Sequence, residues 1–392
     1  MSRQLWFARG TRIAALIALF AAAPVAAAFD GKSSSPRVVE AGFHPGKPPA
    51  GLPAESAAAL ARLDGWSRHR DYKASACCDE RVLYVSRLDG KARAARIASI
   101  ETLYAAFEAL LPAPARSAAP AEPVAEWGNQ HRPESGALLL VESADLEDYE
   151  ALIDALKLSV ADEPALAYLG GWFDSHRNQP GLLCADALTA VWQSAPPDIE
   201  VDTVWRSQNE LAHRLAHLLL YRRFGELPHW LRTAAAWHFE QLVTGTIHCF
   251  PGRDGFVAVD GDHDGWRPVL TNEFKGRKKA PLQMAEFADW KRGTWEDAEA
   301  ARAWGMFEYL ATKHPQRLSA LCEALRLHRV DHGKITHADG SWKLVPNYVI
   351  PGSEQQQICA QQLGADFLDK AGAFFVDWKG WKSPATLAKG KR

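Results

Sequence analysis

One segment, residues 208–240, holds side chains whose types and spacing could do chemistry. Its sequence is Q-N-E-L-A-H-R-L-A-H-L-L-L-Y-R-R-F-G-E-L-P-H-W-L-R-T-A-A-A-W-H-F-E. His213 and His217 are four residues apart, so on a helix they would share one face. Two such histidines can bind zinc, and a carboxylate beside a zinc-bound water can act as a general base in hydrolysis. The segment therefore indicates a place for zinc chemistry, provided that enough ligands converge there.

The same segment resembles the active-site helix pair of the gluzincin metallopeptidases, in the peptidase MA-like branch that is found in exported bacterial proteins. The connector F-G-E-L-P-H-W-L at residues 224–231 and its two flanking helices carry the resemblance. Residues 168–174, Y-L-G-G-W-F-D, are similar to this branch too. So are the helix before residue 113 and the helices after residue 295, in the same order. The resemblance extends from about residue 80 to about residue 380 and implies a zincin-like fold.

The resemblance also implies which residues stand at the zinc ligands. The family pattern is H-E-x-x-H on one helix and a third ligand, a glutamate, on the next. The first histidine falls on Asn209, the general base on Glu210, the second histidine on His213 and the third ligand on Thr233. An amide and a hydroxyl are poor zinc ligands beside imidazole and carboxylate. We therefore expect a degraded site with a vestigial base, no working peptidase and a function in binding a peptide or a cell-envelope component.

A shifted ligand set is the alternative. His213, His217 and His229 could bind zinc together if the two helices run antiparallel, which would give an active metallopeptidase or hydrolase. Arg214 would then occupy the position of the general base, so the usual route of hydrolysis would fail.

A second candidate ion site is the turn D-G-D-H-D-G-W at residues 260–266. Asp260, Asp262 and Asp264 match the first half of a calcium loop, but Thr271 stands where an EF-hand has glutamate. A calcium turn outside the EF-hand family and a plain solvated turn are both open.

The elements around these residues predict an α+β fold. Strands at 82–86 and 137–141 alternate with helices at 96–111 and 146–156, which favours a mixed α/β N-terminal part. From residue 205 the pattern is mainly helical. We expect helices at 207–224, 229–243, 296–312, 315–327 and 355–375, and a hairpin at 335–345. The expected divisions are an α/β part at 56–200 and a helical, zincin-like part at 201–380, between a leader at 29–55 and a basic tail at 381–392.

The first 28 residues have the pattern of a secretory signal peptide. Arg3, Arg9 and Arg12 precede an apolar run at 13–23, and an A-x-A site ends at Ala28. We therefore expect an exported protein, periplasmic or extracellular. An oxidising compartment permits disulfides among Cys77, Cys78, Cys184, Cys249, Cys322 and Cys359, in a pairing that spacing does not select.

The charge of the chain argues against a nucleic-acid partner, and its hydropathy argues against a membrane span in the mature chain. The formal net charge is −2, and loss of a signal with three arginines and no acidic residue would make it −5. This balance argues against nucleic acid, which attracts a basic surface. After the signal, no stretch approaches the roughly 18 apolar residues of a membrane span, so we expect none in the mature chain.

Overall fold

The computed structural model describes most of the chain between residues 39 and 384. The described residues are 39–42, 52, 54–66, 71–113, 136–156, 181–184, 188–195, 206–249, 265–276, 281–288, 297–340, 342–345 and 348–384. They all belong to one unit of residues 35–392. The expected signal peptide, the Tyr168 segment and the possible calcium ligands Asp260, Asp262 and Asp264 lie outside the described residues.

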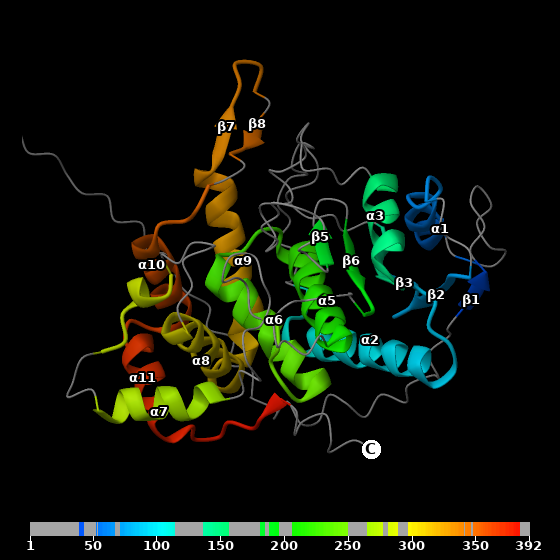
Figure 1. Cartoon of the computed structure of the whole chain (residues 1–392). Coiled ribbons are helices and arrows are strands. Elements are labelled where there is room, and N and C mark those ends of the chain that lie inside the picture. Colours follow the sequence, from blue (N-terminus) through cyan, green and yellow to red (C-terminus); the bar gives the residue numbers. More distant parts are fainter. Residues whose placement is uncertain are drawn as a thin grey trace, which may run out of the picture. The chain divides into compact units, whose positions relative to one another are not determined.

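A six-stranded mixed sheet organises the N-terminal part (Figure 1). Its strands are β1 (Val39–Gly42), β2 (Lys73–Cys77), β3 (Val82–Ser86), β4 (Leu138–Ser143), β5 (Gly181–Cys184) and β6 (Thr189–Gln193), in the order β1-β2-β3-β4-β6-β5. The central strands β3, β4 and β6 are parallel, with Val82 opposite Leu138 and Leu139 opposite Thr189. All residues of these three strands are buried, which explains their almost continuous apolar sequences.

Helices cover both faces of this sheet. On one face α2 (Gly90–Leu110) packs Ile100 and Phe107 into the same core as Tyr84. On the other face α1 (Ala54–Ala61) and α3 (Leu146–Ala155) contribute to a separate core that contains Leu83 and Val85. Alternate residues of β3 thus enter two different cores, as the two-residue period of a strand requires.

The C-terminal part consists mainly of helices. They are α5 (Ser207–Phe224), α6 (His229–Thr244), α7 (Trp266–Gly276), the short η5 (Met284–Glu286), α8 (Asp297–Lys313), α9 (Pro315–His332), α10 (Gly352–Leu363) and α11 (Phe367–Asp377). A two-stranded hairpin, β7 (Lys334–Thr336) and β8 (Trp342–Leu344), projects beyond the end of α9 (Figure 1). α6 packs between α5 and α8, so the helix pair lies inside the molecule.

The expected α+β class is confirmed, with a mixed N-terminal part and a mainly helical C-terminal part. The helix expected at 355–375 is instead two helices, because Gly364 adopts a left-handed φ of 107° that ends α10. The helix expected from residue 96 begins earlier, at Gly90, directly after Asp89 at its N-cap. Among the described residues, no helix combines the length and apolar character that crossing a membrane requires.

Candidate functional site in the α5–α6 helix pair

The connector between α5 and α6 brings the two helices side by side. Gly225, with φ 64°, ends α5, and Pro228 precedes the first residue of α6, where its fixed φ suits a helix start. Asn209 and His213 in the first half of α5 contact Glu240 near the end of α6. The helices therefore run antiparallel, and their polar residues face each other across the pair.

A buried carboxylate of the sheet fixes the beginning of α5. Glu142 on β4 accepts a 2.5 Å hydrogen bond from Ser207 Oγ at the first residue of α5. Ser207 Oγ also accepts a 2.9 Å bond from Trp192 Nε1 on β6. These contacts hold the first turn of α5, which includes Asn209, against the sheet.

Three side chains meet between the first turns of α5 and the last turns of α6. Asn209 Nδ2 donates to Glu240 Oε1 at 2.8 Å, and His213 Nδ1 lies 3.0 Å from Glu240 Oε2. The Glu240 side chain is fully buried, and that of His213 is 12% exposed. Each oxygen of the Glu240 carboxylate is therefore held by a residue of the opposite helix.

The chain after α6 returns to the same carboxylate. The backbone N–H groups of His248 and Cys249 donate to Glu240 Oε1 at 2.5 and 3.0 Å. The Cys249 Sγ lies 3.2 Å from Glu210 Oε1. Burial raises the pKa of the Cys249 thiol, and the neighbouring carboxylates of Glu210 and Glu240 raise it further. In this environment the thiol stays protonated and donates a hydrogen bond to Glu210 Oε1.

His213, Glu240 and Cys249 form a buried group that could hold a metal ion. An imidazole nitrogen, a carboxylate oxygen and the thiol sulfur all lie within 4.8 Å of one another. Nitrogen, oxygen and sulfur donors of these types are zinc ligands in proteins.

Glu210 is occupied on both of its oxygens. Its Oε2 accepts from Arg214 Nε at 2.9 Å and lies 2.7 Å from Arg214 Nη2, and its Oε1 faces Cys249. Only 1% of Glu210 is exposed. Arg214 thus pairs with the glutamate one turn before it instead of pointing away from the site.

The other predicted ligands take different positions. His217 Nε2 lies 3.1 Å from His213 Nε2, and burial, followed by the charge of His213, holds the pKa of His217 well below its usual range. His229 Nδ1 accepts a 3.0 Å bond from Arg232. Thr233 is 1% exposed and lies on α6 seven residues before Glu240, about two helical turns away.

Sequence reasoning missed Glu240 and Cys249 as members of this site. A period of seven residues places Glu240 on the helix face of Thr233, and a glutamate in an apolar helix needs buried partners. This signal was available in the sequence. No comparable signal marks Cys249, because it follows the end of α6 and reaches the site only through the return of the chain.

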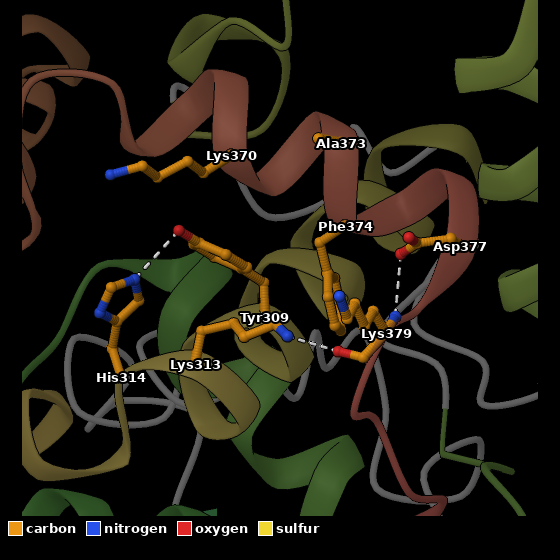
Figure 2. A pocket seen from close by; sticks show the side chains of 8 residues that line it. All are labelled: Tyr309, Lys313, His314, Lys370, Ala373, Phe374, Asp377 and Lys379. Atoms are coloured by element: carbon orange, nitrogen blue, oxygen red, sulfur yellow. Dashed lines mark hydrogen bonds between the residues drawn. The ribbon is translucent and has the colours of Figure 1, made fainter.

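A surface pocket of about 350 Å³ lies elsewhere, where the ends of α8 and α11 meet (Figure 2). Its lining residues are Tyr309, Lys313, His314, Lys370, Ala373, Phe374, Asp377 and Lys379. Three lysines favour an anion, yet Lys370 already pairs with Asp366 at 2.9 Å, and Lys313 donates to the backbone carbonyl of Lys379. The helix pair therefore offers the more specific chemistry of the two places.

The comparisons with known proteins give no further constraint on this site. No model of a known protein family matches this chain, and no curated protein matches it. The resemblance to gluzincins therefore rests on the residues of the chain itself.

Proposed function

We propose that this chain is an exported, gluzincin-like protein that does not cleave peptides and that acts by binding. The observation that carries this proposal is the state of Glu210, the residue at the position of the general base. A general base must reach the water whose proton it takes, directly or through one further water. Glu210 instead gives both carboxylate oxygens to protein partners, Arg214 and Cys249.

The ligand positions support the same proposal. Asn209 uses its amide to hold Glu240, and the position of the third ligand carries Thr233, a neutral hydroxyl. His213 is the single strong ligand left in the aligned set, whereas catalytic zinc takes three protein ligands. Zinc in the aligned positions is therefore not part of the proposed function. Calcium at Asp260, Asp262 and Asp264 stays a prediction.

A peptide is the partner that the sheet favours. β5 stands at the end of the strand order, and among the described strands it pairs only with β6. An extended peptide can add to such an edge through main-chain hydrogen bonds. β6 contacts α5, so a peptide added at β5 would lie one strand away from the strand that packs on the first turn of α5.

Incubation of the purified mature chain with a mixed peptide library, with and without added zinc, tests the proposal. We expect peptides to be retained on the chain without cleavage, as measured by mass spectrometry after gel filtration. Cleavage that a chelator abolishes would overturn the proposal. Loss of cleavage in His217→Ala and its persistence in Asn209→Ala would then favour the shifted set His213, His217 and His229, which the 3.1 Å contact of the first two supports.

Export is a separate element of the proposal. The protein recovered from its native host should begin near Phe29, directly after the A-x-A site. N-terminal sequencing that returned Met1 or Ser2 would contradict it.

A further inference from the structure

We propose that His213, Glu240 and Cys249 bind one zinc ion at a buried site between α5, α6 and the chain that follows α6. This ligand set differs from the aligned set and from the shifted one, because Glu240 and Cys249 belong to neither. The inference goes beyond the proposed function and does not depend on it.

The geometry of the three side chains suits a tetrahedral ion. Bonds of roughly 2.0–2.3 Å place neighbouring ligand atoms roughly 3.3–3.8 Å apart. The three donor atoms already lie within 4.8 Å of one another, and His213 Nδ1 is 3.0 Å from Glu240 Oε2. A small separation of the imidazole from the carboxylate would admit the ion between them.

The charges of the site favour a divalent cation bound to a thiolate. Glu210 and Glu240 are both buried carboxylates, and Arg214 supplies one fixed positive charge beside them. With a neutral imidazole and a protonated thiol, this group carries one excess negative charge. Zinc binding releases the thiol proton to solvent, and the resulting thiolate and zinc bring the group to neutrality. A charge-neutral group is the arrangement that a buried site tolerates best.

The neighbouring residues hold the ligands in orientation. Glu240 Oε1 is fixed by Asn209 and by the N–H groups of His248 and Cys249, which leaves Oε2 for the ion. The Nε2 of His213 faces His217, so Nδ1 is the nitrogen directed at Glu240. Hydrogen bonds of this kind orient metal ligands and strengthen binding.

The nature of the donors selects the metal. A thiolate favours zinc over magnesium or calcium, which take oxygen ligands. Cys249 is 3% exposed, the Glu240 side chain is fully buried, and the His213 side chain is 12% exposed. Three protein ligands leave one position of a tetrahedral ion to a water or another small ligand.

Cobalt(II), a spectroscopic substitute for zinc, tests the ligand set in the full mature chain after chelation and dialysis. We expect one cobalt per chain, with visible bands of a tetrahedral ion and a near-ultraviolet sulfur-to-cobalt band that zinc abolishes. Cys249→Ser should remove the sulfur band and weaken zinc binding by more than about 100-fold. Asn209→Ala should weaken it by about 10–100-fold, as loss of a ligand's hydrogen-bond partner does.

Cys322→Ser is the matched control, since Cys322 is an equally buried free cysteine on α9, and its spectrum should equal that of the parent. If Cys249→Ser does not fold, X-ray absorption at the zinc edge of the unmutated chain decides, and one sulfur ligand is expected. A chain without bound metal, or a spectrum unaffected by Cys249→Ser, would overturn the site. Peptide cleavage by the zinc-loaded chain would overturn the proposed function instead and leave the zinc site standing.

Discussion

Two buried carboxylates, Glu142 in the sheet and Glu240 in the helix pair, differ in the groups that compensate their negative charge. Glu142 has a fixed cation beside it, because Arg96 Nε and Nη2 donate to its two oxygens at 3.2 and 3.3 Å. Glu240 has an amide, an imidazole and two backbone N–H groups around it, and no arginine or lysine among the partners that the structure gives it.

The difference shows which buried charge belongs to the scaffold and which could respond to a ligand. An arginine stays charged at every pH at which proteins fold, so the pair of Glu142 and Arg96 has one state. The side chain opposite Glu240 is instead an imidazole, a type of group that can be neutral, protonated or bound to a metal ion. The sheet thus fixes the position of α5, while the helix pair holds a group of a type whose charge can change.

The largest expected effect is that of removing the charge of Glu142. Glu142→Gln should lower the free energy of unfolding by about 3–5 kcal/mol, because it leaves the mostly buried Arg96 without its counter-charge. Urea unfolding in the presence of a chelator measures this. Asp154→Asn, on the exposed side of α3, is the control and should change stability by less than about 0.5 kcal/mol.

An effect of intermediate size is expected at Glu226, in the connector between α5 and α6. Burial raises its pKa to about 7, although Arg329 and Arg232 oppose the shift. A carboxyl whose pKa is higher in the folded chain than in the unfolded chain stabilises most at low pH, and this stabilisation is lost as pH rises through about 7.

Glu226→Gln cannot ionise, so the stability difference between variant and parent should depend on pH. Between pH 5 and pH 8 it should change in favour of the variant by on the order of 2–3 kcal/mol. Thermal or urea unfolding across this range checks the sign. A difference that does not change with pH, or that changes in favour of the parent, would show that the guanidinium of Arg329 outweighs burial.

The smallest effect is expected at Glu240 in metal-free protein. Glu240→Gln should lower the free energy of unfolding by about 1–2 kcal/mol. The partners that remain are neutral or backbone donors, so no arginine or lysine is left without its counter-charge. Urea unfolding in chelator, run beside Glu142→Gln, makes the comparison direct. If the two substitutions cost the same, the contrast between a fixed and a variable counter-charge is wrong.

Periodic apolar residues made most of the fold predictable. The helices at 207–224 and 229–244 and the buried strands near 82–86 and 138–143 follow from spacing and from the residues at their ends. β1, β2, β5 and β6 were not predicted. Three of these lie outside the parallel centre of the sheet, and such short segments carry little pattern of their own.

The site was predictable only in part. Asn209, Glu210 and His213 could be placed on one helix by spacing, and the structure gathers them near one another with Glu240 and Cys249. The pairing of His213 with Glu240 depends on how two helices cross, and the approach of Cys249 depends on a chain reversal. Both are tertiary features that local sequence does not encode.

The continuous core has a consequence for how the chain reaches its folded state. One apolar cluster joins Cys77 and Tyr84 to Trp192, Phe239 and Trp378 without a break near residue 200. A growing chain that has synthesised the sheet and α2 still lacks the helices that cover this face. Completion of the fold therefore waits for almost the last described residue, and a fragment that stops near residue 200 would present a bare apolar surface to its neighbours. The core on this face of the sheet is thus expected to be complete only when both parts of the chain are present.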